Sequence, residues 1–514
     1  MQAAGAAGVG ALMRLGELLH GVRVRKLYAG AYGASLPMQD LPIREIRTDS
    51  RRVERGDLFV ALRGSTEDGH RYIEPAMRAG AAAVVLEEEA ALPDALAMHT
   101  RVVKIVVEDS REALAMIAAA FYGHPSRTLR LVGVTGTNGK TTTTHLLRAV
   151  LEASGETVGM VGTIHHTFGA RSVAATHTTP EPLELNRLLA AMAGEGCQSV
   201  VMEVSSHALD QRRIGALAFA GAVFTNLTQD HLDYHGTMAA YADAKKLLFD
   251  GLASGARAII NADDPWSTYM VRDTRATATS YGTASGADLR AETMEVSLEG
   301  IALTVAAGGR KLSLQSPLTG RFNAWNVLAA GAAGHALGLA WEVIEEGIRR
   351  APPVSGRFER ISSPAGWSAI IDYAHTPAAL EHALTSIREL MTAAQRGRII
   401  TVFGCGGNRD RGKRPQMGRI ASRSSDMTIV TSDNPRDEDP AAIIAEVIAG
   451  AIPGRPVESE PDRRAAIRRA LGLAAPGDVV LVAGKGHERV QEVAGQRHPF
   501  DDRDEVRAYL REHA

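Results

Sequence analysis

A glycine-rich stretch that leads into a lysine and several hydroxyl side chains runs from Gly133 to Thr142. It follows an apolar stretch typical of a strand, Leu129 to Val134, and precedes one typical of a helix, Thr143 to Leu151. Glycines let a chain curl so that several N–H groups face phosphate oxygens, and the N-terminus of the next helix adds partial positive charge. The pattern therefore predicts a loop that binds ATP or a related nucleotide.

Within this loop, Lys140 is expected to reach the terminal phosphates and Thr141 to place its hydroxyl on Mg²⁺. The strict motif of this class has glycine where this chain has Val134. The alternative is a turn rich in glycine and threonine that binds nothing, but the order of lysine and hydroxyls favours a nucleotide. The residues predicted to bind ATP here are Gly136, Thr137, Asn138, Gly139, Lys140, Thr141 and Thr142.

Two further polar groups follow apolar stretches typical of strands. Glu203 lies near the end of Ser199 to Val204, and a carboxylate at the end of a parallel strand could hold Mg²⁺. The stretch from Thr225 to His235 ends with two acids and two histidines within six residues, and one histidine there could be a metal ligand. From spacing alone, a cap or a surface charge explains Glu203 about equally well, and helix capping with hydrogen bonds to the backbone explains the second group about equally well.

Four polar clusters follow predicted strands in the last third of the chain. Because the carboxyl ends of parallel strands lie along one edge of a sheet, we expect the clusters to converge on one crevice. The alternative, in which the arginines are solvated surface charges, is weakened by the recurrence of glycine-associated clusters at corresponding positions. They are Asp372 to Pro377, Gly404 to Arg414, Asp433 to Arg436, and Gly484 to Glu488.

The composition is ordinary for a globular protein, with 45% apolar and 23% charged residues among 514. The 57 basic and 59 acidic residues nearly balance, which argues against a nucleic-acid or membrane-surface partner. No apolar run reaches the roughly 18 to 20 residues of a membrane-spanning helix. The Ala/Gly-rich start has no basic residues ahead of it, unlike a secretion signal. We therefore expect a cytoplasmic protein whose residues 1–12 are disordered.

Only two cysteines, Cys197 and Cys405, occur in the chain. This number argues against a disulfide framework and suits a reducing compartment. Either thiol could be a nucleophile, but both lie among apolar and small residues. A buried packing role is therefore favoured for both.

The elements that must position these groups alternate between strand and helix. A small α/β unit is predicted from about Ile43 to Leu86, and the alternation in the middle third indicates a parallel sheet. After Gly356 the alternation restarts as a second doubly wound pattern, and Pro352-Pro353 is a plausible hinge. We predict an α/β fold with three domains, at residues 1–108, 109–353 and 354–514.

Together these groups resemble the motifs of the Mur ligases, ATP-dependent enzymes that build the cell-wall peptide. The resemblance covers nearly the whole chain after residue 40, and it explains Val134, because the loop of that family is written T-G-T-N-G-K-T. The motifs that carry it are Thr48 to Arg51, Gly56 to Ala61, Gly136 to Thr142, Glu203 to His207, Asp230 to Gly236, Tyr241 to Lys245, Asp372 to Pro377 and Asp433 to Arg436.

The resemblance implies a small N-terminal α/β domain that binds a uridine nucleotide, a central P-loop domain with a parallel sheet, and a C-terminal Rossmann-like domain that binds an amino acid. It implies an amide-forming ligase of peptidoglycan precursor synthesis, and hence a role in cell shape and division. A substrate carboxylate takes the γ-phosphate of ATP to give an acyl phosphate, and an amine then displaces phosphate. We expect a monomer whose acceptor is a UDP-N-acetylmuramoyl dipeptide.

The metal site is also implied by the resemblance. Thr141 and Glu203 would hold one Mg²⁺, and His231 would join a second. On composition Lys245 is a solvated helix lysine beside Lys246, and an ammonium would repel a metal. The family carbamylates the matching lysine with CO₂, which makes it a carboxylate that can support Mg²⁺. Lys140, Lys245 and His231 are the catalytic residues that the resemblance implies.

The remaining contacts implied by the resemblance fall into three sets, one for each substrate. Those to the UDP-linked acceptor are Ser50, Thr178, Thr179, Ser205, Gln211 and Arg213; those that close on the nucleotide are Asn323, Asn326 and Arg357; those to the incoming amino acid are Arg409, Asp433, Asn434, Pro435, Arg436, Gly484 and Glu488.

Arg436 bears on which amino acid is added. A planar guanidinium can clamp the second carboxylate of meso-diaminopimelate, whereas lysine has no such carboxylate. The alternatives are a lysine-adding ligase, a folate polyglutamate ligase, and an ATP-binding regulatory protein without activity. A folate enzyme should lack Arg436 and the segment from Thr48 to Ala61, and a mere binder needs no second metal site. Three positions depart from the common pattern of the family: His177, Asn408 and Ala378.

Overall fold

The computed structural model describes residues 12–28, 37–64, 67–391 and 397–513. The chain forms two compact units, which we call the first unit (residues 1–287 and 332–340) and the second unit (residues 288–331 and 341–514). The extension predicted to be disordered lies outside the described residues, apart from the exposed Leu12. The three domain boundaries and the hinge at Pro352-Pro353 stay predictions.

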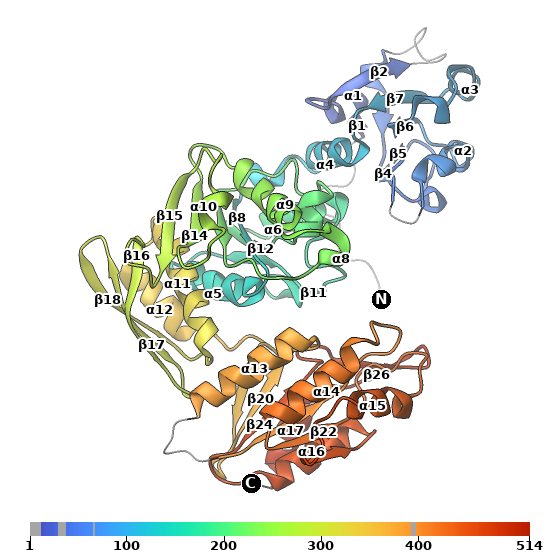
Figure 1. Ribbon diagram of the computed structural model, residues 1–514. Helices are drawn as coiled ribbons and strands as arrows, with labels where there is room; N and C mark the ends of the chain where they lie inside the picture. Colours follow the sequence, from blue (N-terminus) through green and yellow to red (C-terminus); the bar gives the residue numbers. More distant parts are fainter. Residues whose placement is uncertain (1–11, 29–36, 65–66, 392–396, 514) are drawn as a thin grey trace. The chain divides into compact units, whose positions relative to one another are not determined.

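The first unit begins with a five-stranded sheet in the order β2-β7-β6-β5-β4, coloured blue in Figure 1. Successive residues of β6 alternate between two apolar clusters: Val85 packs with α1 and α4, and Val84 packs with α2 and α3. This two-sided burial is why the inner strands β5 and β6 consist of apolar residues alone, whereas the edge strand β2 carries Arg25 and Lys26. The elements are β1 (Met13–Arg14), α1 (Leu15–Leu18), β2 (Val24–Tyr28), β3 (Pro42–Ile43), β4 (Ile46–Arg47), β5 (Leu58–Val60), α2 (Ile73–Arg78), β6 (Ala83–Leu86), α3 (Asp94–Thr100), β7 (Val103–Val107) and α4 (Ser110–Phe121).

A larger sheet of the first unit has the order β11-β10-β9-β12-β8-β13-β14-β15. It is parallel from β9 to β15, as the sequence predicts, but its other edge is the antiparallel pair β10 and β11. The strands are β8 (Arg130–Thr135), β9 (Val158–Val161), β10 (His165–Phe168), β11 (Arg171–Ala174), β12 (Ser199–Glu203), β13 (Gly221–Phe224), β14 (Arg257–Asn261) and β15 (Thr277–Gly282).

The helices of this sheet place its polar groups. One begins directly at Lys140, three residues earlier than the sequence predicts, because Gly139 takes a left-handed conformation (φ +85°) that turns the loop into the helix. Apolar side chains of α6 and α9 pack in one cluster with residues of β8, β12 and β13. The helices are α5 (Lys140–Ala153), α6 (Pro182–Gly194), α7 (Ser206–Asp210), α8 (Leu232–His235), α9 (Met238–Asp250) and α10 (Ser267–Met270).

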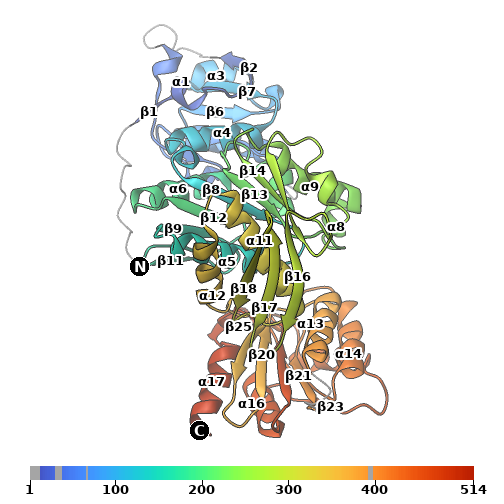
Figure 2. The ribbon, with the colours of Figure 1, turned by 90° about the vertical axis from the view of Figure 1, so that its left-hand side faces the viewer.

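The second unit opens with three antiparallel strands joined by short turns, β16 (Leu289–Val296), β17 (Ile301–Ala307) and β18 (Arg310–Ser316), followed by α11 (Arg321–Ala336) and α12 (Trp341–Arg350) (Figure 2). Residues from Ile301 to Ala307 alternate between buried and half-buried positions, so one face of β17 is covered. This antiparallel piece is absent from the sequence prediction, which expects only alternating strands and helices.

The rest of the second unit is a sheet in the order β19-β20-β24-β21-β22-β23, parallel except for β19. Helices α13, α14 and α15 pack on one face, and α16 and α17 pack on the other. The elements are β19 (Glu359–Ser362), β20 (Ser368–Asp372), α13 (Pro377–Leu390), β21 (Ile399–Phe403), α14 (Lys413–Ser424), β22 (Met427–Val430), α15 (Pro440–Ile448), β23 (Val457–Ser459), α16 (Arg463–Leu473), β24 (Val479–Ala483), the hairpin β25 (Val490–Val493) and β26 (Gln496–Pro499), and α17 (Asp502–Glu512).

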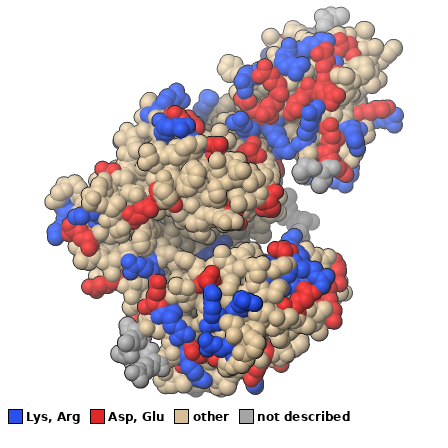
Figure 3. All heavy atoms as spheres, viewed as in Figure 1, with Lys and Arg blue, Asp and Glu red and all other residues tan. Residues whose placement is uncertain are grey.

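The surface agrees with the balanced charge of the chain. On the face drawn in Figure 3, basic and acidic side chains are interspersed. Within the described ranges, no helix is both long enough and apolar enough to cross a membrane.

Candidate functional site

The glycine-rich loop of the first unit is supported by the residues that follow β13. Gly136 has φ +148°, and a Cβ added there would lie 1.9 Å from Oγ1 of Thr225, so only glycine fits. The Thr225 hydroxyl donates to the carbonyl of Asn138 (2.6 Å). The Asn226 carbonyl accepts the N–H of Thr137 (2.8 Å), and its side-chain oxygen accepts the N–H of Asn138 (3.0 Å). Thr225 and Asn226 directly follow β13, the strand beside β8, and their support of this particular loop was not predicted from the sequence.

Lys140 lies at the N-terminus of α5, where the sequence predicts a phosphate-binding lysine. Its Nζ donates to the carbonyls of Gly136 (2.9 Å) and Thr137 (2.8 Å), so the ammonium is held against the backbone of the loop. The left-handed glycines, the helix N-terminus and the ammonium together have the chemistry of a phosphate cradle.

Glu203 ends β12 and is almost fully buried, with 2% of its surface exposed. Its Oε2 accepts the hydroxyl of Thr141 at 2.9 Å, so the structure brings together the two residues that the sequence assigns to one Mg²⁺. The burial excludes the alternative of a surface charge. A buried carboxylate and a hydroxyl are hard oxygen donors, so this pair fits Mg²⁺.

Lys245 is buried in α9, with 1% of its surface exposed, so its interpretation as a solvated lysine is wrong. Its Nζ donates to the carbonyl of Gly136 (2.9 Å) and lies 4.4 Å from the centre of the Tyr241 ring. Burial lowers the pKa of the Lys245 ammonium well below its usual value, and the nearby charge of Lys140 lowers it further. The neighbouring Lys246 is also buried and forms ion pairs with Asp250 and Asp273.

His231 caps the short helix α8 in a left-handed conformation (φ +52°), and its side chain is 46% exposed. Its ring lies 4.9 Å from that of His207 and 6.1 Å from that of Tyr241, measured between centres. Within the part of the chain that the structure describes, no three His, Cys, Asp or Glu side chains form a metal-binding group by themselves. The second metal predicted at His231 stays a prediction.

Most residues predicted to hold the UDP-linked acceptor form one group beside Glu203. The Thr179 hydroxyl donates to the Glu203 carbonyl (2.8 Å) and accepts the N–H of Ser205 (3.1 Å). Arg213 donates to the Thr179 carbonyl (2.9 Å) and to Oε1 of Gln211 (2.7 Å). Thr178 joins the group through Thr163, a residue that the sequence analysis missed.

Ser50, which is also predicted to bind the acceptor, lies elsewhere in the first unit. It opens a single 3-10 turn, residues 50–52, after β4, and Asp49 caps that turn by accepting the N–H of Arg51 (3.0 Å). Among the described residues, no hydrogen bond joins Ser50 to the group at Glu203.

The residues predicted to close on the nucleotide lie in the second unit. Asn323 and Asn326 are buried in α11, where Asn323 donates to the Thr319 carbonyl (2.7 Å) and Asn326 donates to Oδ1 of Asn323 (2.8 Å). The Arg357 guanidinium lies 4.8 Å from the centre of the Tyr373 ring. Nε of Arg357 is buried and has no hydrogen-bond partner in the described chain.

The four polar clusters of the second unit converge, as the sequence predicts. They follow β20, β24, β21 and β22, which are neighbours in the sheet. The Gly484 N–H donates to the Asp372 carbonyl (3.1 Å), and Nζ of Lys413 donates to the His375 carbonyl (2.9 Å). The Asp372 side chain accepts the N–H of Ala374 (2.9 Å), and burial raises its pKa.

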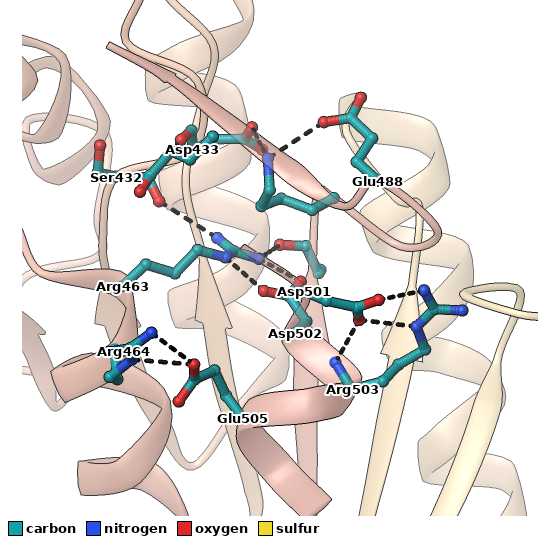
Figure 4. Close-up of polar contacts among 12 residues, drawn as sticks. Ser432, Asp433, Arg463, Arg464, Glu488, Asp501, Asp502, Arg503 and Glu505 are labelled. Atoms are coloured by element: carbon teal, nitrogen blue, oxygen red, sulfur yellow. Dashed lines mark hydrogen bonds and ion pairs between the residues drawn. The ribbon is translucent and has the colours of Figure 1, made fainter. Parts of the chain in front are cut away.

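A buried lysine organises the predicted amino-acid pocket. Lys485 is fully buried; its Nζ donates to Oδ1 of Asn434 (3.0 Å) and Oε2 of Glu488 (3.2 Å) and lies 3.9 Å from Oδ1 of Asp433. Asn434 also donates to Oε2 of Glu488 (2.8 Å). Figure 4 shows Asp433 and Glu488 facing this ammonium. Gly484 is required beside them, because a Cβ there would lie 2.6 Å from Oδ2 of Asp433.

Arg436 lies at the same edge in a left-handed conformation (φ +52°) and is held by the hairpin β25–β26. Its N–H donates to the Glu492 carbonyl (3.0 Å), and its carbonyl accepts the N–H of Ala494 (2.7 Å). Nη1 donates to the Gly407 carbonyl (2.7 Å), and Nε lies 3.5 Å from Oε2 of Glu492. The guanidinium is therefore fixed beside the pocket, with 24% of the side chain exposed.

Two fully buried arginines support this pocket: Arg414, the last residue of the predicted cluster that begins at Gly404, and Arg463, which was not predicted from the sequence. Arg414 binds both oxygens of Glu438 (2.9 Å each), whose pKa its guanidinium lowers to about 2, and Glu438 also accepts the N–H of Asn408, next to Arg409. Arg463 pairs with Asp502 (2.7 and 2.8 Å) and donates to the last carbonyl of β24 (3.0 Å) (Figure 4). Nothing in their local sequence distinguishes them from surface arginines.

Both cysteines are buried, which confirms the packing role predicted for them. Burial raises the pKa of the Cys197 thiol, and it raises that of Cys405 to about 12. Neither thiol is therefore poised as a nucleophile.

Comparisons with known proteins cover almost the whole chain. Three family models match: "Mur ligase family, catalytic domain" at residues 42–122, "Mur ligase middle domain" at residues 134–334, and "Mur ligase, glutamate ligase domain" at residues 356–486. The chain is 44% identical to a UDP-N-acetylmuramoyl-L-alanyl-D-glutamate–2,6-diaminopimelate ligase of Geobacter metallireducens, over 97% of this chain and 99% of that protein. It is 45% identical to the ligase of the same name from Geobacillus kaustophilus, over 91% and 94%.

Solved structures agree with these sequence matches. A structure of a UDP-N-acetylmuramoyl-L-alanyl-D-glutamate–2,6-diaminopimelate ligase matches with a TM-score of 0.69 and 32% identity, covering 93% of this chain and 97% of the other. A folylpolyglutamate synthase of Mycobacterium tuberculosis matches with a TM-score of 0.60 and 19% identity, covering 73% and 92%, which shows a shared fold.

Proposed function

The chain belongs to the Mur ligase family, and on that premise we propose that it adds meso-diaminopimelate to UDP-N-acetylmuramoyl-L-alanyl-D-glutamate at the expense of ATP. It is a ligase of peptidoglycan synthesis, as its relatives are named. The observation that carries the proposal is the assembly of Thr141, Glu203 and Lys245 around one glycine-rich loop. Conversion of a carboxylate into an amide through ATP needs cations and fixed donors around the transferred phosphate, and this loop supplies both.

Positioning is the main task of the residues at the loop. The acceptor carboxylate attacks the γ-phosphate of ATP, ADP leaves, and an acyl phosphate results. Lys140 would place its ammonium against the phosphate oxygens, where negative charge builds up during transfer. Thr141 and Glu203 would hold Mg²⁺, which neutralises phosphate charge. The amine of diaminopimelate then attacks the acyl carbon, phosphate leaves, and the amine gives up a proton.

Lys245 is proposed to carry a carbamate. Its neutral amine would attack CO₂, form an N–C bond and release a proton, leaving an anion beside the loop. The burial of Nζ and its lowered pKa support this step, because only the unprotonated amine is a nucleophile. Native protein incubated with ¹³C-bicarbonate should give a carbamate signal in ¹³C NMR, and Lys245→Ala should not. The same signal in both proteins would contradict the proposal.

The pocket in the second unit is proposed to hold the distal end of diaminopimelate, which carries one carboxylate and one ammonium. Arg436 would pair with the carboxylate, and Asp433 and Glu488 would attract the ammonium. Arg409, Asn434, Pro435 and Gly484 complete the pocket. Lysine has no distal carboxylate and would leave the Arg436 guanidinium without its partner.

Contacts elsewhere complete the proposal. Ser50, Thr178, Thr179, Ser205, Gln211 and Arg213 would hold the acceptor, and Asn323, Asn326 and Arg357 would close on the nucleotide. We also propose a monomer in the cytoplasm; the two buried free thiols support a reducing compartment.

The deciding experiment measures phosphate release with ATP, Mg²⁺ and the UDP-linked dipeptide, with diaminopimelate or lysine offered separately. We expect release to depend on diaminopimelate and to be at least about 100-fold slower with lysine, since an unpaired guanidinium costs a few kcal/mol. Equal release with lysine would contradict the specificity. No release with either amino acid would contradict the ligase activity.

A further inference from the structure

A continuous chain of hydrogen bonds, made by three threonine hydroxyls and the Glu203 carboxylate, joins the phosphate loop to Thr178, which is proposed to bind the acceptor. Oε2 of Glu203 accepts the hydroxyls of Thr141 (2.9 Å) and Thr163 (3.1 Å). Oγ1 of Thr163 in turn lies 3.1 Å from Oγ1 of Thr178. The four residues come from the start of α5, the loop after β9, the segment before α6 and the end of β12.

The loop after β9 encloses the Glu203 carboxylate. The backbone N–H of Thr163 donates to Oε1 (2.8 Å), so Thr163 contacts both oxygens. A Cβ at Gly162 would lie 2.5 Å from Oε1, which shows how closely the backbone follows the carboxylate. A carboxylate held at both oxygens has one orientation, and Thr163 supplies two of the three hydrogen bonds that Glu203 accepts from Thr141 and Thr163.

The direction of the hydrogen bonds follows from the chemistry of the groups. A carboxylate can only accept hydrogen bonds, so the Thr163 hydroxyl must donate its single proton to Glu203. Between the two threonines the donor is then Thr178. Because the Thr178 hydroxyl donates its proton to Thr163, its oxygen can only accept a hydrogen bond from a ligand. A substrate N–H or O–H suits that position, and a carbonyl or phosphate oxygen does not.

A second link ties the same segment to the same strand end. The hydroxyl of Thr179 donates to the main-chain carbonyl of Glu203 (2.8 Å) and accepts the N–H of Ser205 (3.1 Å). Thr178 therefore cannot move away from Glu203 as a flexible loop would. Thr163 is thus the residue through which a change in the orientation of the carboxylate would reach Thr178.

We propose that Thr163 is a positioning residue that couples the two substrates, so that Mg²⁺–nucleotide bound at Thr141 and Glu203 favours the UDP-linked acceptor at Thr178, and the reverse. The proposal rests on the proposed function for the identity of the two ligands. Coupling of this kind is reciprocal, so each ligand must tighten the other by the same factor.

The test compares Thr163→Val with Thr163→Ser. Valine matches threonine in shape and keeps the backbone N–H, so it removes only the hydroxyl, whereas serine keeps the hydroxyl. Thr144→Val is a matched control, because Thr144 is buried in α5 and its hydroxyl has no hydrogen-bond partner in the described chain. Calorimetry would measure binding of UDP-N-acetylmuramoyl-L-alanyl-D-glutamate with and without Mg²⁺ and a non-hydrolysable ATP analogue, and binding of the analogue with and without the acceptor.

We expect the nucleotide to tighten acceptor binding by about 10-fold in the native protein, within the usual range of coupling. Thr163→Val should reduce this factor to about 2-fold or less, and the lost hydroxyl should lower the melting temperature only slightly. Thr163→Ser and Thr144→Val should keep it. A purely structural role for Thr163 would change the melting temperature and leave the factor intact.

The outcomes separate this inference from the proposed function. If the native protein releases phosphate with diaminopimelate but Thr163→Val keeps the native coupling, the inference is overturned and the function stands. If the native protein shows no coupling, the inference is likewise overturned. If the acceptor does not bind at all and no phosphate is released, the proposed function is contradicted, and so is the inference that rests on it.

Discussion

The proposed phosphate-loop site of the first unit and the proposed amino-acid pocket of the second unit are built from different chemistry. The first is held by hydroxyls and main-chain groups around a single buried carboxylate, Glu203. The second is held by three fully buried cations, Arg414, Arg463 and Lys485, each paired with acids. Loss of a hydrogen bond to a charged group costs about 1.5 to 3 kcal/mol, whereas breaking a buried ion pair costs about 3 to 5 kcal/mol. Mutations should therefore reduce rate at the first site, and both affinity and stability at the second.

The largest effect is expected at the phosphate loop. Lys140→Met should slow turnover at least about 1000-fold, because the ammonium meets charge that develops only during phosphate transfer. Steady-state phosphate release measures this loss. Lys311→Met, at an exposed position of β18, is the matched control and should keep full activity. A loss below about 10-fold at Lys140 would break the assignment of chemistry to the first site.

A smaller effect, on one substrate only, is expected at Arg436. Arg436→Lys should lower kcat/KM for meso-diaminopimelate about 100-fold, because an ammonium cannot make the paired hydrogen bonds of a guanidinium. The KM values for ATP and the UDP-linked acceptor should stay within about 2-fold. Equal changes for all three substrates would show that Arg436 acts on the fold and not on the pocket.

Lys485→Met should raise the KM for diaminopimelate about 10-fold and lower the free energy of unfolding by about 3 kcal/mol, because Glu488 and Asn434 lose a buried donor. The control is Arg398→Met, which breaks an ion pair between Arg398 and the buried Asp478. These two residues directly precede β21 and β24, so they lie at the ends of the strands away from the pocket. It should lower the melting temperature without changing KM. A Lys485→Met variant with native KM would mean that the charge network stabilises the sheet but does not shape the pocket.

The smallest effect is expected at Cys405, which lies between Gly404 and Gly406 after β21, beside the proposed amino-acid pocket. With its pKa raised to about 12, the thiol is almost fully protonated at pH 8, so a thiol reagent should label it only on unfolding or as the pH rises toward that value. Cys405→Ala should change kcat by less than about 2-fold. Rapid labelling with loss of activity in folded protein at pH 8 would contradict this.

Sequence reasoning predicted the parts of both sites that follow from strand order. In a parallel sheet the carboxyl ends share one edge, so Glu203 near the glycine loop and the four converging clusters of the second unit could be expected. The reason is local, because each group directly follows a strand whose apolar pattern is clear. The loop of Lys140 was similarly evident from its glycines.

The sequence could not show contacts made between distant segments. Lys245 looks like a solvated lysine because the helical pattern does not reveal that the carbonyl of Gly136 lies within reach of its Nζ. Thr163 and Arg463 are common residue types with no local signal, and their partners lie 40 and 39 residues away. The antiparallel strands β16 to β18 were missed because pairing depends on register, which composition does not encode.

The hairpin that holds Arg436 bears on attempts to exchange amino-acid specificity between relatives. Arg436 takes its left-handed backbone conformation while bonded through both main-chain groups to residues 492 and 494, more than 50 positions later. If the segment from Asp433 to Arg436 alone were grafted into a related enzyme, it would bring the guanidinium but not the hairpin that fixes its position. A working transplant has to move residues 433–436 and 488–496 as one cassette, with the register of β25 and β26 preserved.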